Sequence, residues 1–184
     1  MARVPLIDFQ TAGGEARPAL DQIHKAFGAI PAMFLATANS PVALRSMWSA
    51  FGALAGGTLP AKLKEQLAVA IADRNACEYC LAAHTALGSK AGASSFEMSE
   101  AQAGRSSDPH TAAALTFALR LVESRAQVVD EDVSALRRAG FSDEAIVEIV
   151  AHVALNLFTN YVNVALAVPV DFPRVSLRKA DLSV

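Results

Sequence analysis

The sequence lacks any run of basic residues. Its 16 Lys and Arg residues and 18 Asp and Glu residues are interspersed, and the formal net charge is −2 at pH 7. Proteins that bind nucleic acid attract phosphates with clustered cationic side chains. The charge distribution therefore predicts no nucleic-acid partner.

Long hydrophobic runs are missing as well. No stretch of about 18 residues, the length that a membrane-spanning helix needs, is free of polar side chains. The N-terminal sequence MARVPLIDFQ contains no apolar segment like that of a signal peptide. We therefore expect a cytoplasmic protein with no membrane partner.

Cysteine and aromatic residues are scarce, whereas alanine is abundant. The chain has 2 Cys and 7% aromatic residues, and 53% of its residues are hydrophobic. Alanine loses the least conformational entropy in a helix, so this composition predicts an all-α fold. The hydrophobic share exceeds that of ordinary soluble domains, which predicts that the chain buries surface in a homo-oligomer.

The chain has the length of a single domain, residues 1–184, with its own core. Prolines at helix starts and glycines after helix ends indicate most of the boundaries. They divide the chain into an N-terminal arm (1–40), motif-bearing helices (41–92), a second helical unit (107–168) and a tail (169–184). The expected helices are 16–27, 32–38, 41–54, one from 60 to a polar interruption at 73–75, one from there to 90, 95–103, 109–126, 130–140 and 143–168.

Both cysteines lie in the stretch Glu65–His84, where Cys77 and Cys80 form a Cys-x-x-Cys pair. Cysteines three residues apart share one helical face, within the Cα separation that a disulfide requires. His84 follows Cys80 by four residues, so it lies one turn along the same face and can take the thiol proton. Free N–H groups in the first turn of a helix would stabilise a thiolate there. The spacing indicates a redox-active thiol site.

Glu65 can join this site only if the chain turns. Along one unbroken helix, the 12 positions between Glu65 and Cys77 would span about 18 Å. The polar segment Asp73–Ala76 predicts a break, with Asn75 as the N-cap of the helix that carries Cys77. Such a turn would fold Glu65 back toward the cysteines.

The same residues have less specific interpretations. Cys77, Cys80 and His84, with Glu65 as a fourth, are ligand types for zinc, although a structural zinc site needs four suitable ligands. The cysteines could also be unreactive core residues, Glu65 a solvated charge and His84 a core or interface histidine. Their joint spacing favours redox chemistry, so no metal and no other cofactor is expected.

The spacing of Glu65, the Cys-x-x-Cys pair and His84 resembles the AhpD-like alkylhydroperoxidase branch of the carboxymuconolactone decarboxylase-like proteins, over about residues 40–92. The ending NYVNVALAVPVD is similar to that of peroxidase-related members. The resemblance implies an AhpD-like helical bundle, a trimer or hexamer, and reduction of alkyl hydroperoxides. It further implies that Cys80 attacks the peroxide, that Cys77 closes a disulfide, and that Glu65 and His84 relay protons.

One position departs from the family pattern. Well-characterised members carry a histidine directly before the second cysteine, where this sequence has Tyr79. Tyrosine can donate a hydrogen bond but is a poor base near neutral pH. Tyr79 is therefore a candidate for the pocket or for an altered relay.

Residues 144–163 resemble the cysteine stretch after an offset of 79 positions. Glu144 takes the place of Glu65, and Asn156 and Thr159 take those of the cysteines. This similarity suggests a degenerate internal repeat whose second copy kept the shape and lost the chemistry; chance similarity is the alternative. The second copy also carries a stripe of polar residues on an apolar helix, namely Glu144, Glu148, His152, Asn156, Asn160 and Asn163.

This polar stripe has two interpretations. It is either a hydrogen-bonded structural or subunit contact, or it brings His152 or Asn160 into a pocket over Cys80. We keep both residues as candidates for the pocket or relay. Met47, Trp48 and Phe51 are expected in the core or the pocket wall.

The leading functional hypothesis is a thiol-dependent peroxidase-like oxidoreductase, with a peroxide as substrate and a dithiol or thiol as reductant. One alternative is a decarboxylase or another lyase of the carboxymuconolactone decarboxylase type, which does not require cysteines. The intact Cys-x-x-Cys pair argues against it. Another alternative is a redox-sensing protein without turnover, which the sequence does not separate from a slow peroxidase.

Overall fold

The computed structural model describes residues 2–178; Met1 and the end of the expected tail, 179–184, lie outside the described residues. Within that range the regular structure is helical and contains no strand, so the predicted all-α fold is confirmed. The elements are η1 (Gly14–Ala16), α1 (Arg17–Phe27), α2 (Ala32–Thr37), α3 (Pro41–Ala55), α4 (Ala61–Arg74), α5 (Glu78–Lys90), α6 (Ser95–Gln102), α7 (Pro109–Glu123), α8 (Asp130–Arg138) and α9 (Asp143–Ala165).

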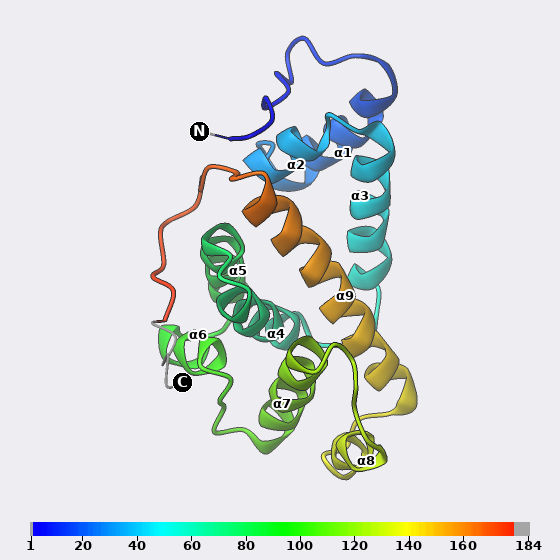
Figure 1. Cartoon of the computed structure of the whole chain (residues 1–184), viewed down its shortest axis with the longest axis vertical. Helices are drawn as coiled ribbons and strands as arrows, with labels where there is room; N and C mark the ends of the chain where they lie inside the picture. The colour runs from blue at the N-terminus through cyan, green and yellow to red at the C-terminus, as the bar shows by residue number, and fades with distance from the viewer. Residues whose placement is uncertain (1, 179–184) are drawn as a thin grey trace.

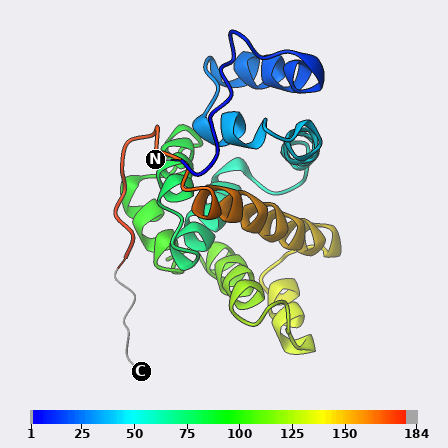
Figure 2. The same ribbon diagram turned by 45° about the horizontal axis from the view of Figure 1, so that its top comes forward.

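Helix α9 runs through the middle of the molecule, and the other helices pack around it (Figure 1). Figure 2 shows α1, α2 and α3 on one side of α9 and the remaining helices on the other. Contacts with α3, α4, α5 and α7 bury Ile149 and Asn160 of α9 completely. The fold therefore has two groups of helices that meet along α9.

By length and composition, α9 is the one helix in the described part of the chain that could cross a membrane. Half of its most apolar 18-residue window is buried against other helices. Core helices of soluble proteins have this character, because they bury apolar side chains against neighbouring elements. The packing identifies α9 as such a core helix, and the cytoplasmic location stays a prediction.

The helix starts follow the capping residues that the sequence indicates. Pro109 opens α7, and the side chain of Asp108 accepts hydrogen bonds from the backbone N–H groups of the first turn. The last two long helices end earlier than expected. Ala126 and Ala167, which the sequence analysis placed inside these helices, have φ values of 63° and 49°, so the backbone is left-handed there and cannot continue a right-handed helix.

The predicted break between Glu65 and Cys77 is present, but its capping differs from the expectation. Asn75 is the C-cap of α4 and not the N-cap of α5. Ala76 follows with a left-handed φ of 52°, which turns the chain. The N-cap of α5 is Cys77, because the turn moves the start of the helix beyond Asn75 and puts the Cys77 sulfur next to the first free N–H groups.

The expected second copy does not keep the shape of the first. Residues 144–163 lie in the unbroken helix α9, whereas residues 65–84 bend between α4 and α5. At the positions that correspond to Asp73–Ala76, α9 has the sequence HVAL, which contains no capping or turn residue. A helix therefore continues where the first copy turns. The internal repeat and the division into arm, units and tail stay predictions.

The described part of the tail connects the two groups of helices. After α9 it runs, drawn from orange to red in Figure 1, along α5 toward α6. Its Asp171 carboxylate accepts a hydrogen bond from the backbone N–H of Ala32 (2.7 Å), and Arg178 N–H donates to the carboxylate of Asp73 (2.9 Å). Phe172 is thereby positioned against the ring of Tyr79, with 5.7 Å between the ring centroids.

Candidate active site

The two cysteines meet at the start of α5. After the left-handed turn at Ala76, the N–H of Cys77 donates to the carbonyl of Ala72 (2.8 Å). The sulfur of Cys77 accepts a hydrogen bond from the backbone N–H of Cys80 (3.3 Å). The two thiols are free and buried, and their sulfur atoms lie 2.6 Å apart. Both sulfurs therefore lie at the start of α5, close enough for a disulfide to form between them.

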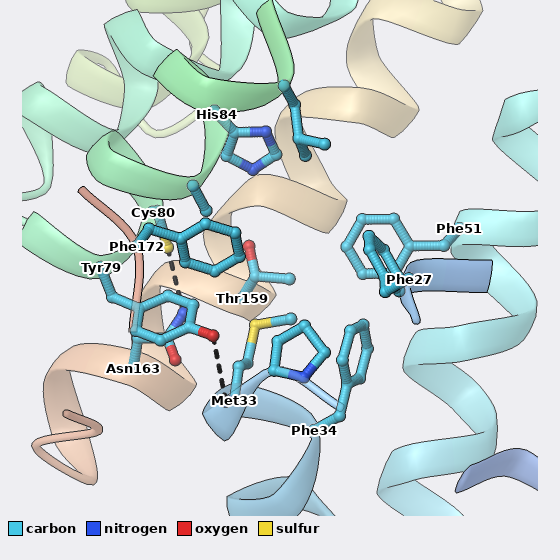
Figure 3. A pocket seen from close by; sticks show the side chains of 13 residues that line it. Phe27, Met33, Phe34, Phe51, Tyr79, Cys80, His84, Thr159, Asn163 and Phe172 are labelled. Carbon is cyan, nitrogen blue, oxygen red and sulfur yellow. Dashed lines mark hydrogen bonds between the residues drawn. The ribbon is translucent and has the colours of Figure 1, made fainter. Parts of the chain in front are cut away.

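Glu65 and His84 form a pair across the α4–α5 contact. Oε2 of Glu65 lies 2.7 Å from Nδ1 of His84, and the two side chains are only 21% and 15% exposed. The turn thus brings Glu65 to His84, as the sequence predicted. His84 and Cys80 line the same pocket (Figure 3).

These neighbours set the charges of the site. Burial alone would lower the pKa of His84, but the adjacent Glu65 carboxylate raises it above its ordinary value. Burial raises the pKa of Cys80, yet the hydrogen bond from Cys77, the positive charge of His84 and the Asn163 amide together lower it to about 7. The hydrogen bond to Cys80 and burial raise the pKa of Cys77. Of the two thiols, Cys80 therefore ionises more readily, and Cys77 donates a hydrogen bond to it.

Helix α9 contributes amide groups to the sulfur, a role that the sequence did not assign to Asn163. Nδ2 of Asn163 donates to the sulfur of Cys80 at 3.1 Å (Figure 3). Asn160 is fully buried, its Oδ1 accepts from Asn75 (2.9 Å), and it also lowers the pKa of Cys80. Both asparagines belong to the polar stripe, but sequence spacing could not tell which of its members reaches the cysteine.

An apolar pocket opens over Cys80, and aromatic rings from separate elements form most of its wall (Figure 3). Phe51 lies in this wall as expected, Met47 is fully buried, and Trp48 packs edge-on against Phe34. The sequence did not indicate the contributions of α1, α2, the tail and Thr159. The lining residues are Phe27, Pro31, Met33, Phe34, Phe51, Tyr79, Cys80, Ala83, His84, Leu87, Thr159, Asn163 and Phe172.

Tyr79 is part of this wall. Its hydroxyl accepts a hydrogen bond from the backbone N–H of Met33 (3.3 Å), and its ring packs edge-on against Phe172. Burial raises the pKa of its phenol, which therefore stays neutral and cannot act as a base. Tyr79 links α5 to α2 and shapes the pocket.

His152 lies outside this pocket. It lines a neighbouring cavity of about 360 Å³, together with Lys64, Glu65 and His84. Burial, followed by the charge of Lys64, lowers the pKa of His152, so the imidazole is neutral. Its Nε2 is buried and has no hydrogen-bond partner among the described residues. His152 is therefore a neighbour of the Glu65–His84 pair and not of Cys80.

The metal-site interpretation can be compared with the arrangement of side chains. Among residues 2–178, no group of three or more His, Cys, Asp or Glu side chains converges in a way that could hold a metal ion. Glu65 pairs with His84 through Nδ1, and the two sulfurs face each other and the Asn163 amide. Glu65 and His84 therefore form one pair, and Cys77 and Cys80 form the other.

The fold and this site define an all-helical protein with a Cys-x-x-Cys pair at a helix start and a Glu–His pair beside it. Residues 42–124 match the carboxymuconolactone decarboxylase family. This match spans helices α3 to α7. No curated protein matches the sequence.

Solved structures share the fold over nearly the whole chain. An AhpD-core, peroxidase-related protein from Ralstonia eutropha JMP134 is 24% identical, with a TM-score of 0.84 over 92% of each chain. A peroxidase-related protein from Silicibacter sp. TM1040 is 22% identical, with a TM-score of 0.77 over 94% of this chain and 90% of that one. The debrominase Bmp8, as a variant in complex with 2,3,4-tribromopyrrole, is 22% identical, with a TM-score of 0.77 over 93% of this chain and 92% of that one. These likenesses establish the AhpD-like fold.

Proposed function

We propose that this protein is a thiol-dependent oxidoreductase that reduces organic hydroperoxides through Cys80 and Cys77. The observation that carries the proposal is the position of the Cys80 sulfur. It lies in the apolar pocket, with a second thiol at 2.6 Å and the Glu65–His84 pair beside the same pocket. These are the parts that a two-cysteine peroxidase needs: a thiolate, a resolving thiol and a proton donor.

In the first step, the Cys80 thiolate attacks the terminal oxygen of the hydroperoxide. The O–O bond breaks, Cys80 becomes a sulfenic acid, and the leaving alkoxide takes a proton from His84 to depart as an alcohol. Glu65 holds the imidazole through Nδ1 and stabilises its cationic form before the transfer. The Asn163 amide, which donates to the sulfur, stabilises the thiolate that starts the reaction.

In the second step, the sulfur of Cys77 attacks the sulfur of the sulfenic acid. The Cys77–Cys80 disulfide forms, and the sulfenic oxygen leaves as water. An external dithiol then reduces the disulfide by two successive exchanges and is itself oxidised to a disulfide. The net reaction converts a hydroperoxide and a dithiol into an alcohol, water and a disulfide, with no cofactor.

The pocket wall favours an organic peroxide. Its rings come from Phe27, Phe34, Phe51, Tyr79 and Phe172. Apolar surface of this kind gains free energy when it covers an apolar group of the substrate, about 25 cal/mol for each Å² removed from water. Hydrogen peroxide offers no such group, so we expect faster turnover with cumene hydroperoxide.

The proposal is tested by peroxide consumption. Wild-type protein with cumene hydroperoxide and dithiothreitol should consume peroxide catalytically, and Cys80→Ser should fall to the uncatalysed rate, because the thiolate is lost. Circular dichroism checks that the variant is folded. Equal consumption by both proteins would refute the proposal. A wild type that forms one disulfide per chain, detected by mass spectrometry, but does not turn over would identify a redox sensor.

A second candidate function is reductive removal of bromine from an aromatic ring. It is favoured by the fold that this chain shares with the debrominase Bmp8 and by the ring-lined pocket over Cys80. Replacing a carbon-bound bromine with hydrogen consumes two electrons and releases bromide, and the cysteine pair can supply both electrons by forming its disulfide. Bromide release from 2,3,4-tribromopyrrole in the presence of dithiothreitol, compared with cumene hydroperoxide turnover, decides between the two.

A further inference from the structure

The cavity beside the Glu65–His84 pair is larger than the pocket over Cys80. Its volume is about 360 Å³, whereas that of the pocket is about 50 Å³. Phe51, His84 and Thr159, which Figure 3 labels, line both spaces. The pocket over Cys80 can therefore hold a peroxide group, while the larger part of an organic substrate needs the space next to it.

Lys64 brings a positive charge to this larger cavity. Its ammonium group donates to the backbone carbonyls of Leu54 and Ala55 at the end of α3, at 3.4 Å each. Both distances are longer than the usual range for such bonds, about 2.7–3.2 Å. No carboxylate of residues 2–178 forms an ion pair with Lys64. The ammonium group is therefore able to bind an anion.

The acids beside the cavity are bound to other groups. Glu65 pairs with His84, with 2.7 Å between Oε2 and Nδ1. The carboxylate of Glu148, one turn before His152 in α9, accepts hydrogen bonds from two backbone N–H groups between α3 and α4, at 2.8 and 3.1 Å. Neither carboxylate offsets the charge of Lys64, so an anion in the cavity would be attracted.

His152 supplies a second hydrogen-bond donor to the same cavity. The residue is only 8% exposed, and its Nε2 has no partner among the described residues. A buried polar atom without a partner costs free energy, which a ligand that bonds to it would recover. The imidazole is neutral, because burial and the charge of Lys64 lower its pKa, and it therefore carries one N–H that can donate to an oxygen.

The rest of the wall, apart from the pair, Asn156 and Thr159, is apolar. These lining residues are Phe51, Leu54, Ala55, Ala61, Ala68 and Leu155. A carboxylate has two oxygens for the two donors and one negative charge for the ammonium group. A phosphate or a sugar would leave more of its polar surface without partners against such a wall. The cavity therefore suits a carboxylate on a hydrocarbon body.

We propose that the cavity of Lys64 and His152 binds a carboxylate of the substrate, while the hydroperoxide group of the same molecule reaches Cys80 in the adjoining pocket. The substrate class is then an organic hydroperoxide that carries an acid group. Lys64 forms the ion pair, and His152 donates the second hydrogen bond. The reaction in this inference rests on the proposed function, whereas binding of the acid group does not depend on turnover.

Calorimetric titration of the reduced full chain with para-isopropylbenzoate tests the binding. This probe has the carbon skeleton of cumene hydroperoxide and a carboxylate, but no peroxide. It should bind at least about tenfold more tightly than para-isopropylbenzyl alcohol, because a hydrogen bond between charged groups is lost in the alcohol. Lys64→Met should remove this preference, with an unchanged circular dichroism spectrum.

Lys62→Met is the matched control, because it removes the same charge from the same helix, and Lys62 pairs with Glu97. It should keep the wild-type preference for the acid. Equal affinity of wild type for the acid and the alcohol overturns the proposal. An equal loss in the two lysine variants does so as well.

The pKa of His152 reports where the acid binds. Saturation with para-isopropylbenzoate should raise this pKa, because a negative charge next to the ring favours the imidazolium form. NMR titration of the imidazole signals measures the shift, and His152→Gln identifies the signal by its loss. A His152 pKa that the acid does not change places the acid elsewhere and overturns the proposal.

Turnover separates this inference from the proposed function. Wild type should have a kcat/KM at least about tenfold higher for para-carboxycumene hydroperoxide than for cumene hydroperoxide. Lys64→Met should bring this ratio close to one, mainly through KM. Equal kcat/KM values in wild type overturn the acid site and leave the peroxidase function intact. Binding of the acid next to His152 without turnover of either hydroperoxide overturns the peroxidase function and leaves the acid site.

Discussion

Residues 65–84 and residues 144–163 start from similar sequences and end with different roles. The first segment bends between α4 and α5 and brings Glu65, His84 and the two cysteines to one point. The second forms the straight helix α9, whose polar groups spread along one line. Only its C-terminal part, at Asn160 and Asn163, reaches Cys80.

The bend between α4 and α5, more than the residue types, creates the candidate site. Glu144 has the position of Glu65 in the sequence, but it lies exposed at the start of α9, far along the helix from Asn163. Because α9 has no turn, the 19 positions from Glu144 to Asn163 span about 28 Å of helix. A carboxylate can shift the pKa of a side chain strongly only from a few ångströms away.

The largest expected effect comes from breaking the pair that the bend assembles. Glu65→Gln removes the carboxylate that raises the pKa of His84, so the imidazole loses its charge at neutral pH and the pKa of Cys80 rises from about 7 toward 9.0. Peroxide turnover at pH 7 should fall about 100-fold, the size of a lost acid–base contribution.

The pH profile of thiol alkylation separates this effect from misfolding. In wild type, the rate at which iodoacetamide alkylates Cys80 should fall as the pH falls through about 7, because the thiolate becomes protonated. Glu65→Gln should move this midpoint to higher pH. Glu144→Gln, the matched change on α9, should leave both turnover and midpoint unchanged; a shift of equal size in the two variants would contradict the role of the bend.

An intermediate effect is expected where α9 meets the cysteine. Asn163→Leu removes the amide that donates to the Cys80 sulfur at 3.1 Å. A hydrogen bond to a charged group contributes about 1.5 kcal/mol or more, so the pKa of Cys80 should rise by about one unit. The thiolate fraction at pH 7, measured by absorbance near 240 nm, should fall about fivefold.

Asn156→Leu is the control for this variant, because the Asn156 amide donates to the carbonyl of His152 in its own helix and does not contact either sulfur. We expect its thiolate titration to match that of wild type. An unchanged titration in Asn163→Leu would show that the amide does not stabilise the thiolate.

The smallest effect concerns the turn itself. Ala76 has a left-handed φ of 52°, which costs an L-residue about 1–2 kcal/mol, whereas glycine adopts it freely. Ala76→Gly should therefore raise the free energy of unfolding by about 0.5 kcal/mol, after the entropy cost of glycine. The same substitution in the straight segment, Ala151→Gly, should lower it by about 1 kcal/mol.

Urea unfolding under reducing conditions, at equal protein concentration, measures both substitutions. The opposite signs are the informative result, since they report opposite backbone conformations at the two alanines. Destabilisation of similar size at both positions would mean that Ala76 is not held in the left-handed turn.

Much of the fold could be predicted from local signals. Proline at the start of α3 and α7, and the capping side chains of Asp108 and Ser142, act within one helical turn, so they are readable in the sequence. The ends of α7 and α9 were less predictable. Left-handed alanines such as Ala126 and Ala167 carry no signal of their own, because alanine has a high helix propensity.

The candidate site was predictable only in part. The Glu65–His84 contact follows from the spacing and one turn, and the structure has it at 2.7 Å. The apolar wall is different, because Phe27, Phe34 and Phe172 come from distant parts of the chain. Their positions depend on how the arm and the tail pack across the core, which sequence spacing does not encode.

The sequence by itself determined the helical character, the break before Cys77 and the four candidate site residues, because these depend on interactions within a few turns of chain. Only the tertiary structure decided which cysteine has the lowered pKa, since the hydrogen bond from Cys77, the charge of His84 and the Asn163 amide act through space on Cys80. It also decided that Lys64 and His152 line one cavity, because the packing of α4 against α9 brings them together.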